Sequence, residues 1–108
     1  MKRLHLAIAT RDLAKTVDDY SVRLGSEPCV VIDGEYALWR TPQLNVSVRS
    51  DPLCKPGELR HPGWEDPDAS DFSEKTDVNG IVWERFSAQR QAKEIEEIWP
   101  GSGYEVEG

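Results

Sequence analysis

Short apolar runs and one amphipathic helical stripe alternate through the first half of the chain. Residues 4–9 are apolar without a helical period, which predicts a strand that is buried on at least one face. The next stripe has the spacing of one helix face and consists of Leu13, Val17, Tyr20 and Leu24. Thr10 or Asp12 can cap this helix, and Gly25 can end it in a left-handed conformation. Three more strands are predicted at 28–32, 35–40 and 44–49.

Turn signals dominate the second half of the chain. A segment with two prolines and a glycine, 51–57, predicts a connector. The segment 59–65 predicts a strand at an edge or a bulge of the sheet, because Pro62 cannot donate a hydrogen bond to a neighbouring strand. Two further strands are predicted around an Asn-Gly turn, at 72–76 and 81–86.

A late helix and the chain length complete the expected organisation. Ser87 caps an amphipathic helix at 87–99, whose apolar stripe is Ala88, Ala92, Ile95 and Trp99. With 108 residues, the chain can form one domain, 1–108, but has no room for separate catalytic and cofactor domains. We therefore expect a single α+β domain.

The charge balance narrows the expected partners. The net charge is −7 at pH 7, and the acidic excess falls in the second half of the chain. Phosphate binding requires clustered Lys and Arg, so we expect no nucleic-acid partner and no anionic-membrane partner. No apolar run approaches the roughly 20 residues that a membrane span needs. The simplest interpretation of the acidic excess is a solvated surface.

The two cysteines, Cys29 and Cys54, are too few and too isolated for a disulfide scaffold or a thiolate metal site. We interpret them as reduced thiols. The N-terminal apolar stretch is short, is interrupted by His5 and Arg11, and lacks a cleavage signal. We therefore expect a cytoplasmic protein that is not exported.

A family resemblance lies in residues 5–28, HLAIATRDLAKTVDDYSVRLGSEP. His5, the small apolar residues after it, Asp12, Tyr20 and Gly25, followed by three strand-like segments, resemble the opening unit of the vicinal oxygen chelate superfamily. This group includes glyoxalase I, extradiol dioxygenases and bleomycin-resistance proteins. The resemblance covers about half of the chain.

The resemblance implies a concave mixed sheet built from two strand-helix-strand-strand-strand modules. Residues 1–50 would form the first module. Residues 58–99 would form a second module that is too short for a crossover helix between its strands. We expect the helix at 87–99 to cover the sheet face that the missing helix would have covered, in its own chain or in a partner. An unpaired sheet edge then favours a homodimer.

The resemblance also implies a metal site. Metal-dependent members of the family take their ligands from the first and the last strand of each module. His5 and His61 fall at the two first-strand positions, and the segment DVNGIVWE resembles the closing motif through Asp77, Gly80 and Glu84. The implied metal ligands are therefore His5, His61 and Glu84.

The fourth ligand position departs from the family pattern. The inward residues of the first module's closing strand are expected to be Asn45 and Ser47, which are both neutral, so a four-ligand glyoxalase-like site is not expected. Two histidines and one carboxylate suit non-heme iron or a related divalent ion, namely Fe, Mn, Ni or Zn. Such an ion acts as a Lewis acid and a template for two neighbouring substrate oxygens.

Strand alternation suggests which side chains surround this site, because successive residues of a strand face opposite sides. Phe86 shares the face of Glu84, and Ser47 faces inward on its own strand. Trp64, close to His61 in sequence, is expected as a cavity wall or a dimer contact. The candidate substrate-binding residues are therefore Ser47, Trp64 and Phe86.

Three function classes follow from these observations. The first is a metal-dependent lyase, isomerase or dioxygenase that acts on a vicinal-oxygen substrate. The second is a metal-free small-molecule-binding protein that resembles the bleomycin-resistance members. The third is a noncatalytic interaction module. No Ser-His-Asp arrangement and no phosphate-binding glycine loop is present in the sequence, and no general acid or base is assigned.

Overall fold

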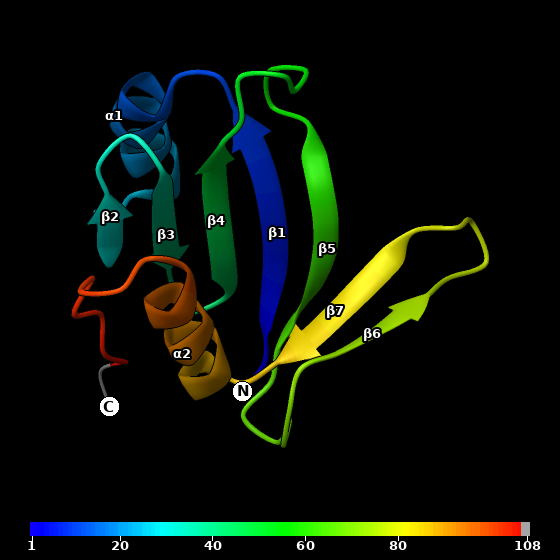
Figure 1. Cartoon of the computed structure of the whole chain (residues 1–108). Coiled ribbons are helices and arrows are strands. Elements are labelled where there is room, and N and C mark those ends of the chain that lie inside the picture. Colours follow the sequence, from blue (N-terminus) through cyan, green and yellow to red (C-terminus); the bar gives the residue numbers. More distant parts are fainter. Residues whose placement is uncertain (107–108) are drawn as a thin grey trace.

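A seven-stranded sheet with a helix on each face forms the described part of the chain, residues 1–106, in a computed structural model (Figure 1). In chain order the elements are β1 (Arg3–Thr10), α1 (Leu13–Leu24), β2 (Val30–Ile32), β3 (Tyr36–Arg40), β4 (Leu44–Ser50), β5 (Leu59–Glu65), β6 (Ser73–Thr76), β7 (Val82–Phe86) and α2 (Ala88–Ile98). The predicted α+β class, with a mixed sheet and a late C-terminal helix, is confirmed. The last two residues of the predicted domain, 107 and 108, lie outside the described residues.

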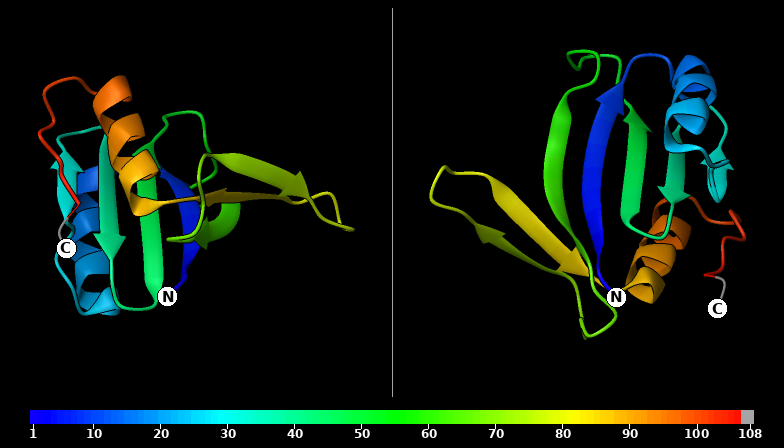
Figure 2. Two further views of the ribbon diagram at one scale, coloured as in Figure 1. Left: turned by 90° about the horizontal axis from the view of Figure 1, so that it is seen from below. Right: turned by 180° about the vertical axis from the view of Figure 1, so that it is seen from behind.

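The sheet has two halves that join where β1 meets β5. The strand order is β2-β3-β4-β1-β5-β7-β6. β1 pairs in parallel with β4, and β5 pairs in parallel with β7, whereas β1 and β5 run antiparallel. The β6–β7 hairpin extends away from both helices (Figure 1). The sheet is open and strongly twisted (Figure 2). β1 and β5 lie in the middle of the sheet and carry two of the predicted ligands.

α1 covers one face of the first half. Asp12 caps the helix by accepting a hydrogen bond from the backbone amide of Lys15, and Gly25 ends it with φ 63°, in the left-handed region. Beneath the helix lies a buried core of Leu13, Ala37, Trp39, Val46 and Val48. The predicted helical stripe is confirmed, because its other members pack against this core: Val17, Tyr20 and Leu24.

α2 covers the opposite face of the same half (Figure 2). Ser87 caps it, as predicted, and Ile95 packs with Tyr36 and Leu38 on the face that points away from α1. In each half the first strand pairs in parallel with the closing strand, and the two first strands, β1 and β5, run antiparallel. A two-fold rotation about an axis perpendicular to the sheet therefore relates the two halves. Because this rotation does not exchange the faces of the sheet, a crossover helix of the second half would lie on the same face as α1. The predicted placement of this helix is therefore wrong within the chain. The helix follows β7 directly, and its apolar stripe buries Tyr36 and Leu38 instead.

Pro62 lies in the interior of the sheet. Its strand, β5, has β1 on one side and β7 on the other, so the predicted edge position is wrong. Pairing with β7 begins at Gly63, one residue after the proline, and no β7 residue is paired with Pro62. The predicted bulge lies nearby, because the β1–β5 register shifts at Arg60.

The second half leaves its α1-side face uncovered. β5 and β6 are joined by a loop, 66–72, rather than by a helix. Trp64 lies on this face with 38% of its surface exposed, and Leu4 and Arg85 are its paired neighbours. Within residues 1–106, neither helix has the length and apolar character needed to cross a membrane.

Candidate metal centre

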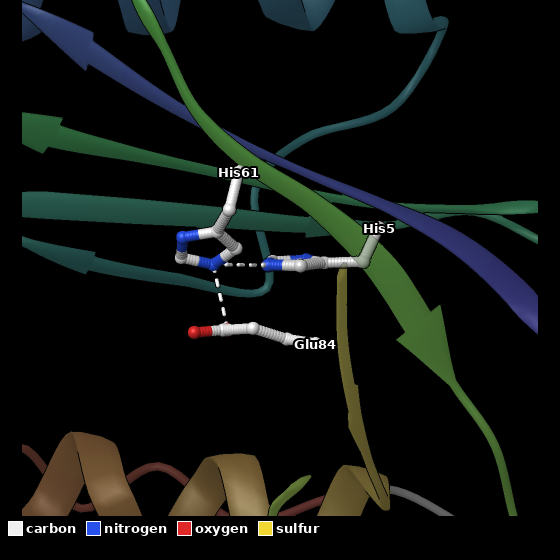
Figure 3. A group of neighbouring side chains, drawn as sticks. All are labelled: His5, His61 and Glu84. Atoms are coloured by element: carbon white, nitrogen blue, oxygen red, sulfur yellow. Dashed lines mark hydrogen bonds and ion pairs between the residues drawn. The ribbon is translucent and has the colours of Figure 1, made fainter. Parts of the chain in front are cut away.

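His5, His61 and Glu84 point toward one another from three adjacent strands, β1, β5 and β7 (Figure 3). The Nε2 atoms of the two histidines are 3.3 Å apart, and His61 Nε2 lies 2.6 Å from Glu84 Oε1. One donor atom from each residue lies within 4.8 Å of the other two. The structure thus brings together the three side chains that the family resemblance implies as ligands. We call them the His–His–Glu cluster.

Strand register explains this convergence. His5 is paired with Gly63, and Gly63 is paired with Glu84, so the three residues form one row across the sheet and face the same side. His61 faces this side from two positions earlier in β5. Because Gly63 has no side chain, the space between His5 and Glu84 stays open. A Cβ atom at Gly63 would overlap the backbone carbonyl oxygen of Glu84, so the close approach of β5 and β7 requires glycine here.

Asn45, which is fully buried, determines which nitrogen of His5 carries a proton. The Asn45 amide nitrogen donates to Glu65 Oε1 at 2.9 Å and to Gln91 Oε1 at 2.8 Å. A carboxylate only accepts hydrogen bonds, so Asn45 must present its NH2 group to Glu65 and its oxygen to His5. His5 Nδ1 lies 2.9 Å from that oxygen and therefore donates to it. His5 Nε2 keeps its lone pair and directs it into the His–His–Glu cluster.

Glu65 is an ionised carboxylate in a buried position. Arg40 donates to it from Nε at 2.7 Å and from a second nitrogen at 3.0 Å, and Arg3 donates from Nη1 at 2.7 Å. Burial alone would raise the pKa of Glu65, but the hydrogen bonds from Arg40, Asn45 and Arg3 hold it at about 2. The group that orients Asn45, and through it His5, is therefore charged at neutral pH.

Burial also keeps His5 neutral. The side chain is 3% exposed, and desolvation lowers the pKa of His5 below its ordinary value, although the hydrogen bond to Asn45 opposes this shift. The Phe86 ring packs edge-on against the imidazole, with ring centroids 4.9 Å apart. A neutral imidazole with a free Nε2 is the form of histidine that binds a metal ion.

A small cavity of about 100 Å³ lies between the His–His–Glu cluster and α2. Ser47 and Phe86, which the sequence analysis placed around the site, both line it. α2 contributes Gln91 and Glu94. Burial and the nearby Glu84 raise the pKa of Glu94. The helix that was expected on the other face therefore forms one wall of the cavity.

Trp64 does not line this cavity. Its neighbours in β5, Gly63 and Glu65, face the cavity side, so strand alternation turns Trp64 toward the α1 side of the sheet. This corrects the expectation that Trp64 forms a cavity wall, because proximity to His61 in sequence does not place it on the same face.

Several residues of the site were missed by the sequence analysis. Glu65 could have been found from the strand period, since it follows His61 by four positions and must share its face. Gln91 and Glu94 lie with Ile95 on one side of α2. Their role depended on which sheet face the helix covers, and local sequence carries no signal for that choice.

The register also relates the two histidines to each other. β1 and β5 pair antiparallel, with Leu6 opposite Pro62. His5 lies one residue before Leu6, and His61 lies one residue before Pro62. A two-fold rotation about an axis through this pair therefore exchanges the two histidines.

The same rotation identifies the partner of Glu84. It exchanges Ala7 and Gly63, which each lie one residue after the central pair. Ala7 is paired with Ser47 in β4, and Gly63 is paired with Glu84 in β7. Ser47 therefore occupies, in the first half, the position that Glu84 occupies in the second. The site carries a carboxylate at only one of these two positions.

Neither a scan against protein-family models nor a search of curated proteins finds a match for this chain.

Proposed function

We propose that the His–His–Glu cluster holds a divalent transition-metal ion and that the protein is a small member of the vicinal oxygen chelate superfamily that acts on a small oxygen-bearing molecule. The observation that carries the proposal is the convergence of three donor atoms from three paired strands, one of them an imidazole Nε2 whose lone pair is directed inward. Two histidines and one carboxylate are a ligand set of non-heme iron, and they also suit Mn, Ni or Zn.

The spacing of the donor atoms supports a metal site. Ligand atoms held at about 2.0–2.2 Å from one ion lie roughly 3–3.5 Å apart, and the two Nε2 atoms are separated by 3.3 Å. His61 Nε2 and Glu84 Oε1 lie at hydrogen-bond distance, so both donor atoms face the same point from neighbouring strands.

The arrangement of the sheet supports membership of the superfamily. In each half, the first strand pairs in parallel with the closing strand. His5 and His61 come from the two first strands, and Glu84 comes from the second closing strand, as the family pattern requires. The neutral Ser47 at the remaining position favours three protein ligands over four.

When bound, such an ion supplies a Lewis acid that polarises substrate oxygens. The chain's own residues hold the site in shape. Asn45 fixes the His5 ring, and Phe86 narrows the cavity beside it. Glu94 presents a carboxylate to the same cavity. These features serve a lyase, an isomerase or a dioxygenase equally.

The size of the cavity disfavours the metal-free alternative. Sites for drug-sized molecules usually enclose about 300–1,000 Å³, whereas this cavity measures about 100 Å³. A protein that sequesters a drug would need a larger opening between α2 and the sheet. The noncatalytic interaction module requires no metal, so metal uptake separates it from the proposal.

Protein purified without chelator is expected to contain about one equivalent of Fe, Mn, Ni or Zn. Glu84→Gln should weaken the affinity for this metal at least about 100-fold, because loss of a ligand costs more than loss of a residue that hydrogen-bonds to a ligand. Glutamine keeps the size of the side chain, so the fold should persist. Elemental analysis and metal titration measure the effect.

Glu74→Gln is the matched control for this experiment, because Glu74 is an exposed glutamate on β6, directly paired with Glu84. It should leave metal affinity unchanged. Absence of bound metal, even after incubation with each ion in turn, would reject the metal site and leave a metal-free binding protein or an interaction module.

We also propose that two chains associate through the uncovered face of the second half. A sedimentation experiment at micromolar concentration is expected to show a dimer, and Trp64→Glu should shift it to monomer, because Trp64 exposes 38% of its surface on that face. Val22→Glu, on the exposed side of α1, is the control. A wild-type monomer at this concentration would contradict the proposal.

The two cysteines support a reducing compartment such as the cytoplasm. Cys29 and Cys54 are both free thiols, one exposed and one buried, and free thiols persist where glutathione and thioredoxin keep them reduced.

A further inference from the structure

Arg49 brings a fixed positive charge to the cavity. It is paired with Ala9, four positions along β1 from His5, and it lines the cavity beyond the His–His–Glu cluster. Its guanidinium carbon lies 5.2 Å from the ring centroid of Trp99, which packs in turn on Tyr36. This aromatic support holds the guanidinium in place without neutralising it.

Arg60 reaches the same cavity because of the β-bulge. His61 is paired with Ala7, and Leu59 is paired with Ile8, so Arg60 is left without a partner in β1. In a regular strand Arg60 would face away from His61. Both residues line the cavity here. The bulge therefore brings a second arginine to the cavity lining, as bulges beside functional sites commonly do.

Neither arginine is engaged in a close ion pair in the part of the chain that the structure describes. No ion pair joins Arg49 or Arg60 to a carboxylate within residues 1–106. The cavity contains two carboxylates, Glu84 and Glu94, which balance the two guanidinium groups. A divalent ion at the cluster would therefore make the cavity positive overall, and an anionic ligand would be favoured only when that ion is bound.

We propose that the cavity binds a small carboxylate that carries an oxygen atom on the neighbouring carbon, with its negative charge held by Arg49 and Arg60 and its oxygens facing the His–His–Glu cluster. Guanidinium groups recognise carboxylates through charge-assisted, paired hydrogen bonds. The cavity of about 100 Å³ lies below the usual range for drug-sized molecules. The ligand is therefore expected to be small. This inference rests on the proposed metal site.

The test compares three small probes on metal-saturated protein: lactate, lactamide and acetate. Lactamide has the oxygen atoms without the charge, and acetate has the charge without the second oxygen. Titration is followed by calorimetry and by tryptophan fluorescence, since Trp99 lines the cavity. Lactate is expected to bind about tenfold more tightly than either analogue, the effect of one charged hydrogen bond. Metal-free protein should not distinguish lactate from lactamide.

Two substitutions locate the bound carboxylate. Arg49→Gln and Arg60→Gln should each weaken lactate binding about tenfold and leave the affinities for the metal and for lactamide unchanged. Arg60 is exposed, so its substitution should not disturb folding. Arg23→Gln, on the exposed side of α1, is the matched control.

The outcomes separate this inference from the proposed function. If metal binds but lactate and lactamide have equal affinities, or if neither arginine substitution affects lactate, the carboxylate proposal is overturned and the metal site stands. If the protein binds no metal in the direct titration, the proposed function fails and the carboxylate proposal fails with it.

Discussion

Glu65→Ala is expected to lower the free energy of unfolding by about 3–5 kcal/mol, the usual cost of removing one partner from a buried ion pair. The substitution leaves Arg40 without its carboxylate and leaves Asn45 with only one of its two acceptors, Gln91 Oε1. The total free energy of unfolding of a domain of this size is only about 5–15 kcal/mol, so the substitution should remove a large part of it. Urea unfolding at pH 7, followed by circular dichroism, measures the change.

The same substitution should act on the site and should depend on pH. With Asn45 held by Gln91 alone, the orientation of His5 is less firmly fixed, and metal affinity should fall about 10–100-fold. The pKa of Glu65 is about 2 in the folded chain, against an ordinary value of 4.5. Its contribution to stability is therefore complete above pH 4.5 and is lost as the pH falls toward 2. The difference in free energy of unfolding between Glu65→Ala and the wild type should therefore decrease as the pH falls from 4.5 toward 2.

Glu97→Ala is the matched control for this prediction, because Glu97 is an exposed glutamate on α2. It should change the free energy of unfolding by less than about 0.5 kcal/mol, as surface substitutions usually do. If Glu65→Ala changed the free energy of unfolding as little as the control does, the ion pairs of Glu65 with Arg3 and Arg40 would not stabilise the fold.

Gly63→Ala should cost about 3 kcal/mol of stability, at the upper end of the usual range for overpacking, because the added methyl group meets the backbone rather than a side chain that can turn away. Relief requires β7 to move away from β5. Since β7 carries Glu84, the movement would open the His–His–Glu cluster and weaken metal binding as well. Unfolding curves and metal titration on the same preparation measure both effects.

Gly57→Ala provides a contrast with the same chemical change. Gly57 has φ 77°, and a Cβ atom added there would meet no neighbouring atom within 4 Å. Alanine at this position therefore costs only backbone strain, about 1–2 kcal/mol. Metal affinity should be unchanged. Equal metal affinities for both variants would show that β7 tolerates displacement and that Gly63 matters only for stability.

The elements could be predicted from sequence where the signal is local. The apolar run around His5, the stripe from Leu13 and the left-handed glycine at Gly25 each depend on neighbours within a few residues, and all three predictions are confirmed. The ligand set depended on the resemblance. The structure shows that His61 and Glu84 lie beside His5, which the chain order alone does not reveal.

What escaped prediction depends on contacts between distant segments. The face that α2 covers is decided by Tyr36 and Leu38, which lie more than fifty residues before Ile95. The polar network behind His5 joins Asn45 to Glu65 across two strand pairings. Local periodicity describes which residues share a face of one strand. It does not describe which face of the finished sheet a later helix will occupy.

The two-fold relation between His5 and His61 means that each half of the sheet contributes one histidine to a shared centre. The halves differ around it: the first has a helix between its strands and serine at position 47, whereas the second has a loop there and glutamate at position 84. A centre shared in this way has no complete half. Cleavage of the chain within 51–57 would therefore leave one donor histidine on each fragment, and only their reassociation could restore the site.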